Sequence, residues 1–315
     1  MKKGFVLLVL AVLGFTYAQD TRTITDDFGV EIEVPVNPQR IVSLSDNGFT
    51  LPLLELGVIP VGTRGRGTPP DGLFIRGGEL LLGVDFDNSD IQYVGDFPPD
   101  LELIAALEPD LIIGFDYEAI DQLRLIAPTY AIDFSLRDAD DIYDILAELT
   151  GSQDQLVFLR RKYNEQLNRL RELVDVGNIT ISTIHADNDG TFFAFNPYPG
   201  IGDVLIDAGF NRPDAITALP QGQNNVISAE RLQEFDGDFI ITTYRYTQGV
   251  TPEQQMDFFE QAFPGYCDLL HACRNGQMYF VPRADFSSLS YAARVSQVVT
   301  LVSIIAGKPF VPFGE

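Results

Sequence analysis

The chain has 315 residues, 45% of them hydrophobic, with 27 glycines and 19 prolines. This composition allows a sizeable core and favours two compact lobes over a single one or a disordered chain. The formal net charge is -24, and because such a surface repels phosphate backbones, it argues against a nucleic-acid partner.

Residues 1–18 have the layout of a secretory signal peptide. Lys2 and Lys3 precede the apolar run FVLLVLAVLGF, and the small side chains of Thr16 and Ala18 stand just before Gln19. A membrane anchor is the alternative, but a span needs about 20 apolar residues. We therefore expect an exported protein, periplasmic or otherwise extracytoplasmic, that is soluble after cleavage.

An N-terminal α/β lobe is predicted for residues 19–150. Short apolar segments rich in β-branched or aromatic residues alternate with segments of helical spacing, as units of strand, helix and parallel strand require. The predicted strands are residues 40–44, 60–63, 110–115 and 129–134.

A single long helix is predicted for residues 151–177. Its apolar positions Leu156, Tyr163, Leu167, Leu170 and Val174 are spaced by seven, four, three and four residues, so they line one helical face. Gly177 offers a C-terminal stop.

A second α/β lobe is predicted for residues 178–315. Its expected strands are residues 179–186, 191–195, 238–244 and 277–282, with helical segments at 200–209 and 290–307. HADNDG at 185–190 superficially resembles a calcium loop, but Asn196 stands where the distal bidentate glutamate belongs. A hairpin turn is the better interpretation.

The only two cysteines, Cys267 and Cys273, are separated by five residues. In an exported protein such a pair can close a small loop as a structural disulfide. His271 lies between them, yet no second cysteine or histidine pair completes a zinc site.

One phrase occurs twice in the sequence. PPDLELIAALEPDLIIGFDY begins at residue 98, and VISAERLQEFDGDFIITTYRY begins at residue 226. Glu102 stands eight residues before Asp110, and Glu230 stands eight before Asp238. The two glutamates therefore occupy equivalent places in the two predicted lobes, each near the start of a helix that leads into a buried strand.

The segments NPQRIVSLS, YVGDFPPDLELIAALEPDLIIG, LRLIAPTYAIDF and GDVLIDAGF resemble the class III substrate-binding proteins of bacterial ABC importers. That group captures ferric siderophores, haem and cobalamin. The resemblance implies two Rossmann-like lobes with mostly parallel sheets joined by one long α-helix. It also implies a monomeric binding protein, not an enzyme, that delivers a ferric siderophore to an ABC permease. By motif position, Glu102 and Glu230 correspond to the glutamates that dock onto the permease; the alternative is a carboxylate that only favours its helix dipole.

Ligand capture is expected between the lobes, in loops that follow the carboxyl ends of strands. The candidate ligand-binding residues on these and neighbouring loops are Arg64, Arg66, Tyr117, Tyr198, Arg245 and Arg283. Arginines in so acidic a chain favour a bulky anionic ferric chelate. No cofactor is expected.

Four other ligand or activity classes remain as alternatives. Haem could bind through Tyr117 or Tyr198, while cobalamin is disfavoured by the absence of tryptophan. Direct capture of a bare metal is disfavoured because only His185 and His271 are available. An exported enzyme is the least favoured, since no G-x-S-x-G, H-E-x-x-H or phosphate-loop motif occurs.

Overall fold

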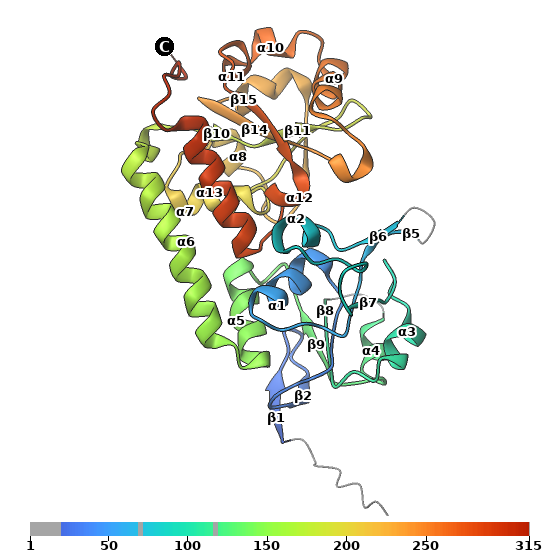
Figure 1. Cartoon of the computed structure of the whole chain (residues 1–315). Helices are drawn as coiled ribbons and strands as arrows, with labels where there is room; N and C mark the ends of the chain where they lie inside the picture. Colours follow the sequence, from blue (N-terminus) through green and yellow to red (C-terminus); the bar gives the residue numbers. More distant parts are fainter. Residues whose placement is uncertain (1–19, 69–71, 116–118, 315) are drawn as a thin grey trace, which may run out of the picture.

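The computed structural model describes residues 20–68, 72–115 and 119–314 (Figure 1). The predicted signal peptide and Tyr117 lie outside these described residues. The chain folds into two lobes with separate sheets, joined along one side by a long helix (Figure 1).

The N-terminal lobe is built on a five-stranded sheet of order β7-β4-β3-β8-β9, in which every neighbouring pair is parallel. The strands predicted at 40–44, 60–63, 110–115 and 129–134 are confirmed as four of these five. Two antiparallel hairpins, β1-β2 and β5-β6, were not predicted. The strands are β1 (Thr21–Thr25), β2 (Glu31–Pro35), β3 (Ile41–Ser43), β4 (Gly62–Thr63), β5 (Arg66–Thr68), β6 (Gly72–Phe74), β7 (Gln92–Tyr93), β8 (Leu111–Phe115) and β9 (Thr129–Ile132). The helices are α1 (Leu51–Glu55), α2 (Gly78–Leu82), α3 (Leu101–Ala106), α4 (Ile120–Leu123) and α5 (Ala139–Thr150).

The C-terminal lobe contains two three-stranded sheets instead of one mostly parallel sheet. The order β10-β14-β15 is parallel, and β11-β12-β13 is antiparallel. The single strand predicted at 179–186 is wrong, because the chain leaves the first sheet after Ser182 and joins the second at Ile184. The strands are β10 (Ile181–Ser182), β11 (Ile184–Ala186), β12 (Phe192–Ala194), β13 (Asn225–Ile227), β14 (Phe239–Tyr244) and β15 (Met278–Pro282). The helices are α7 (Ile201–Ala208), α8 (Asp214–Thr217), α9 (Pro252–Ala262), α10 (Tyr266–Leu269), α11 (His271–Arg274), α12 (Arg283–Phe286) and α13 (Tyr291–Ile305).

Two smaller predictions for this lobe are confirmed. Residues 185–190 form the hairpin between β11 and β12, closed by a hydrogen bond from Asp187 N to Thr191 O of 2.9 Å. Cys267 and Cys273 form a disulfide beside His271, which is itself buried against the C-terminal segment at Val311.

The connecting helix is α6 (Gln153–Leu173), and its predicted inner face is confirmed. Leu156, Tyr163, Leu167 and Leu170 are all buried in a core that extends into both lobes. The predicted stop at Gly177 is wrong: Val174 already takes an extended conformation with φ of -134° and is only 6% exposed. Burial of Val174 ends the helix before the glycine is reached.

The repeated phrase has a structural counterpart in the two parallel sheets. Asp110 precedes β8 and accepts hydrogen bonds from Gln39 N and Arg40 N, at 2.8 and 2.9 Å, just before the neighbouring strand β3. Asp238 precedes β14 and accepts one from Thr180 N, at 2.6 Å, just before the neighbouring strand β10. Each aspartate therefore fixes the backbone just before the neighbouring parallel strand. This common role explains why both phrases contain an aspartate at that position.

The lobes are held together where α13 begins. The Glu55 carboxylate, at the end of α1, accepts hydrogen bonds from Tyr291 N at 2.9 Å, from Ala292 N at 2.6 Å and from the Tyr143 hydroxyl. Ser290 accepts a further bond from Ala293 N at 3.2 Å. Three of the four backbone donors that a helix start leaves unpaired are thus satisfied, two of them by the opposite lobe.

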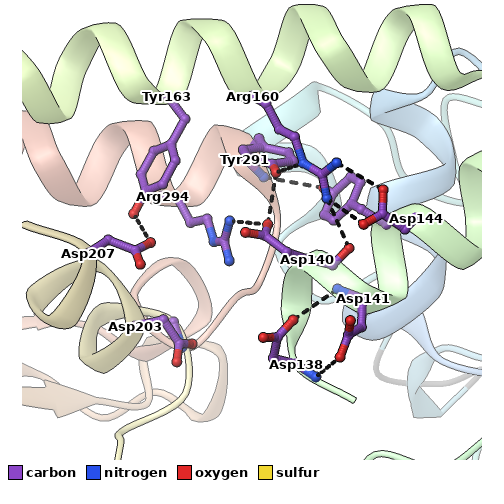
Figure 2. A network of polar contacts seen from close by, with 12 residues as sticks. Asp138, Asp140, Asp141, Asp144, Arg160, Tyr163, Asp203, Asp207, Tyr291 and Arg294 are labelled. Atoms are coloured by element: carbon purple, nitrogen blue, oxygen red, sulfur yellow. Dashed lines mark hydrogen bonds and ion pairs between the residues drawn. The ribbon is translucent and has the colours of Figure 1, made fainter.

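Side chains extend this junction along α5, α6 and α13 (Figure 2). Asp140 accepts hydrogen bonds from the Tyr291 hydroxyl and from Arg294, both at 2.8 Å. Arg160 of α6 binds Asp144 of α5 through two nitrogens, each at 2.8 Å (Figure 2). The three helices are therefore cross-linked by charged hydrogen bonds around the start of α13.

Glu55→Ala should lower the free energy of unfolding by about 3 kcal/mol. The change leaves Ala292 N and the Tyr143 hydroxyl proton without an acceptor, and Tyr291 N keeps only its longer bond to the Tyr143 oxygen, at 3.2 Å. Hydrogen bonds to charged groups contribute about 1.5–3 kcal/mol. Urea unfolding followed by circular dichroism measures the difference. The matched control, Glu172→Ala on the exposed face of α6, should change stability by no more than about 0.5 kcal/mol; equal losses in the two variants would contradict the role of Glu55.

Candidate functional site

A cavity of about 560 Å³ lies where segments of both lobes meet. The N-terminal lobe contributes the β5-β6 hairpin and the segment before α2, and the C-terminal lobe contributes the turn after β14 and the start of α12. Figure 1 shows α2 directly beside α12. The volume is within the range of about 300–1,000 Å³ that is usual for small-molecule sites. The lining residues are Arg66, Gly67, Phe74, Arg76, Asp96, Arg245, Tyr246, Thr247, Gln248, Arg283 and Ala284.

In the N-terminal lobe, a buried aspartate positions two of the arginines. Asp46 is 1% exposed and begins a π-helical turn, Asp46–Thr50, that follows β3. Its carboxylate accepts a hydrogen bond from Arg66 Nε at 3.0 Å and lies 3.8 Å from Arg76 Nη2. Arg76 also donates a hydrogen bond to the Asn47 side chain. These contacts hold the two guanidinium groups in place, and both arginines line the cavity.

Arg64 lies next to this cavity without lining it. Its guanidinium is 3.4 Å from Asp96 and lies over the rings of Phe97 and Phe115, at 5.5 and 5.9 Å from their centroids. The Arg64 side chain is only 10% exposed. Its charge therefore contributes to the field of the cavity, and the exposed Phe97 ring adds an aromatic surface beside it.

In the C-terminal lobe, Arg245 and Arg283 follow the ends of the parallel strands β14 and β15. Arg245 binds Asp187 through two nitrogens, at 2.9 and 3.1 Å. Among the described residues, Arg283 has no carboxylate within ion-pair distance. Within the described part of the chain, Arg283 is therefore the least compensated positive charge of the cavity lining.

Among the described residues, the lining of the cavity holds four arginines and one carboxylate, Asp96. Burial lowers the pKa of Arg76, and repulsion from Arg66, Arg283 and Arg64 lowers it further, against the attraction of Asp46. In Arg66, by contrast, burial opposes the charged form but the Asp46 carboxylate raises the pKa above its usual value. Like charges held this close favour an anionic ligand, because an anion would relieve their repulsion.

The structure brings three of the predicted ligand residues together, namely Arg66, Arg245 and Arg283. Arg64 contacts the lining residue Asp96 but does not itself line the cavity. Tyr198 is 3% exposed, shares a hydrogen bond with the Thr243 hydroxyl at 2.8 Å and does not line the cavity. Arg76 was not among the predicted ligand residues, because it follows β6, which was not predicted, instead of a strand of the parallel sheet. The feature that could have indicated it is its charge, since arginines are few in this acidic chain.

The two glutamates of the repeated phrase are exposed. Glu102 lies in the first turn of α3, where Asp100 caps the helix by accepting hydrogen bonds from Glu102 N and Leu103 N at 2.9 and 3.1 Å. Glu230 lies in a short 3-10 helix, Ala229–Phe235, instead of the predicted α-helix. The side chain of Glu102 is therefore not needed to cap its own helix.

Comparison with known proteins shows the family. The model of the family described as "Periplasmic binding protein" matches residues 90–284, more than half of the chain. The chain belongs to this family. Its members bind substrates and are not enzymes, which confirms the expected class of function.

Curated relatives in this family are similar over much of their length. The chain is 28% identical over 232 residues to the probable siderophore-binding lipoprotein YfiY of Bacillus subtilis, covering 70% of this chain and 68% of the relative. It is 28% identical over 233 residues to the ferric enterobactin-binding periplasmic protein FepB of Escherichia coli, covering 69% of each.

Solved structures of family members share the fold. The FhuD protein from S. pseudintermedius superimposes with a TM-score of 0.73 at 20% identity, covering 92% of this chain and all of that one. SirA of Staphylococcus aureus complexed with staphyloferrin B gives a TM-score of 0.72 at 21% identity, covering 90% and 98%. The two-lobed fold with one connecting helix, predicted from the resemblance, is thereby confirmed. No helix within residues 20–68, 72–115 and 119–314 has the length and hydrophobicity to cross a membrane.

Asp46→Ala should destabilise the protein by about 2–3 kcal/mol, because it leaves Arg66 and Arg76 without their buried counter-charge. Asp96→Ala is the matched control, since Asp96 also lies near arginines, 3.8 Å from Arg66 and 3.4 Å from Arg64, but its own side chain is 46% exposed. Such an exposed pair contributes about 1 kcal/mol or less. Denaturant titrations of both variants make the comparison, and a larger loss for Asp96→Ala would refute the positioning role of Asp46.

Proposed function

We propose that this protein captures an anionic ferric siderophore in the arginine-lined cavity between its lobes and delivers it, as a monomer, to an ABC permease. The observation that carries the proposal is the convergence of Arg66, Arg76, Arg245 and Arg283 from both lobes on one cavity of about 560 Å³. In a chain of net charge -24, the simplest physical reason for this concentration of positive charge is a negatively charged ligand.

The names of the relatives support the general class of ligand and leave its chemistry open. They include an iron(3+)-hydroxamate-binding protein, a ferric enterobactin-binding protein and an Fe(3+)-citrate-binding protein. Within that range, four arginines favour catecholate or carboxylate chelates, which are anionic, over neutral ferric hydroxamates. Hydrogen bonds from three arginines could supply roughly 4.5–9 kcal/mol before ordering and desolvation costs. Micromolar to nanomolar binding needs about 8–12 kcal/mol.

Haem and cobalamin are the second ligand class. Of the two tyrosines considered as haem ligands, Tyr198 is buried in the C-terminal lobe and does not line the cavity, and Tyr117 lies outside the described residues. A thermal-shift panel of catecholate, carboxylate and hydroxamate ferric chelates, haem and cobalamin separates the classes, since a ligand of the folded state raises stability. A shift for haem or cobalamin alone would overturn the siderophore proposal.

Arg283→Ala should weaken the binding of an anionic ferric catecholate or carboxylate chelate at least tenfold. Arg283 can bind the anion without first breaking an ion pair with another described residue. Arg245→Ala should do the same, although loss of the pair with Asp187 adds a structural cost. Quenching of tyrosine fluorescence measures the dissociation constants. A neutral ferric hydroxamate should be affected much less.

The charge-matched control for these variants is Arg169→Ala, an exposed arginine of α6 remote from the cavity. It should bind the anionic chelate as the unmodified protein does. Equal losses for the neutral and anionic chelates in Arg283→Ala would show that the arginine packs on the ligand or supports the fold, and would contradict an anionic ligand.

We further propose that Glu102 and Glu230 contact the permease. The proposal is supported by their equivalent positions in the two lobes and by the exposure of both side chains. Backbone and Ser228 hydrogen bonds lower the pKa of Glu230, so it is a carboxylate at neutral pH. Each could therefore bind a basic residue of a partner.

Replacing both Glu102 and Glu230 with alanine should abolish uptake of radiolabelled ferric chelate by cells while leaving its affinity for the purified protein nearly unchanged. A double variant of two exposed α6 residues, Glu165→Ala with Glu172→Ala, removes the same charge and should retain uptake. Normal uptake by the Glu102/Glu230 variant would exclude a docking role.

A further inference from the structure

A second, smaller cavity opens next to the arginine-lined one in the C-terminal lobe. Its volume is about 40 Å³, and it shares Arg245, Gln248 and Arg283 with the larger cavity. A single water needs roughly 10–15 Å³ by this measure, so the space accommodates a group of about three heavy atoms. The remaining lining residues are His185, Ala186, Asp187, Asn188, Thr243, Val250, Gln255 and Phe258.

His185 is the unusual member of this lining. It lies on β11, is 4% exposed and stacks on Phe193, with a ring-centroid distance of 5.3 Å. Its Nδ1 is buried and has no hydrogen-bond partner among the described residues. Buried polar atoms are usually paired, and an unpaired Nδ1 also leaves the tautomer unfixed, so the ring proton can sit on whichever nitrogen meets a ligand.

The other polar groups around this space are largely committed. Thr243 shares a hydrogen bond with Tyr198, and Gln255 donates one to Ala186 O at 2.6 Å. Asp187, the carboxylate that faces the space, is bound by Arg245. Two groups of this pocket are therefore available to a ligand. They are the His185 ring, which can form a hydrogen bond, and the Arg283 guanidinium, which has no ion-pair partner among the described residues.

We propose that this pocket, formed by His185, Arg245 and Arg283, is a subsite that receives a pendant carboxylate of the bound chelate. The inference rests on the proposed function and adds one feature to it: the ligand carries a small anionic arm beside its iron-binding groups. A carboxylate has three heavy atoms and accepts hydrogen bonds from guanidinium and imidazole N–H groups. Size, charge and hydrogen-bonding capacity thus agree with the pocket.

The electrostatic state of His185 agrees with this assignment. Burial, together with the nearby charges of Arg283 and Arg245, lowers the pKa of His185 to about 3, against the attraction of Asp187. The ring is therefore neutral and retains an N–H donor. A carboxylate between the two arginines offsets the positive charge that acts on the ring.

The test uses acetate, the smallest carboxylate probe, and the two histidines of the chain as reporters. With ¹⁵N-labelled histidine, the imidazole signals of His185 should shift saturably as millimolar acetate is added. His271 serves as the internal control, because it is buried against Val311 in another part of the C-terminal lobe. Neutral acetamide, of the same shape, should produce no such shift.

Two variants locate the response. Arg283→Met should weaken the acetate response at least tenfold, and Val250→Phe should abolish it by filling the small pocket, because Val250 lines that pocket and not the larger cavity. The absence of a saturable shift of His185 up to about 100 mM acetate, an equal shift with acetamide, or a full response in Val250→Phe would overturn the subsite. The assay contains no iron, so its failure is distinct from failure to bind ferric chelates.

Discussion

The arrangement of the two lobes depends on one buried carboxylate. Glu55, at the end of α1 in the N-terminal lobe, accepts the first backbone N–H groups of α13, which follows the C-terminal lobe's last strand. Burial raises the pKa of Glu55, although the hydrogen bonds from Tyr143, Ala292 and Tyr291 oppose the shift. The start of α13 is thus paired with a carboxylate of the other lobe, and separating the lobes at this end would remove that acceptor from the helix N–H groups.

The cavity follows from that fixed arrangement. Its arginines come from four segments, two in each lobe, and their guanidinium groups would repel one another if nothing constrained them. Asp46 holds Arg66 and Arg76 from one side, and Asp187 holds Arg245 from the other. The two aspartates hold three of the arginines in place, and no carboxylate among the described residues forms an ion pair with Arg283. If the ligand is the anion proposed above, the arginines are already in place before it binds, which reduces the ordering cost of binding.

The order of strands read from the sequence predicted part of the cavity lining. Arg66, Arg245 and Arg283 come shortly after β4, β14 and β15, whose hydrophobic pattern is clear, so the rule that ligand sites form at the carboxyl ends of parallel strands selected three residues that line one cavity. Arg76 escaped because β5 and β6 are short, polar and glycine-rich, with no periodic signal. Tyr198 was placed in the site by its residue type alone, but burial against Thr243 keeps it in the core. Long-range partners such as Asp46 with Arg76, and Glu55 with Tyr291, depend on tertiary contacts that no local pattern specifies.

The contrast between an acidic surface and a basic cavity has a kinetic consequence. An anionic chelate that approaches a chain of net charge -24 meets repulsion at long range and attraction only when it is within a few ångströms of the arginines. Because the Debye length is about 8 Å at physiological ionic strength, salt screens the outer repulsion far more than the contacts inside the cavity. If the ligand is the anionic chelate proposed above, its association rate constant should therefore rise with added salt, the reverse of ordinary electrostatic steering. Its capture would then be fastest in a saline medium.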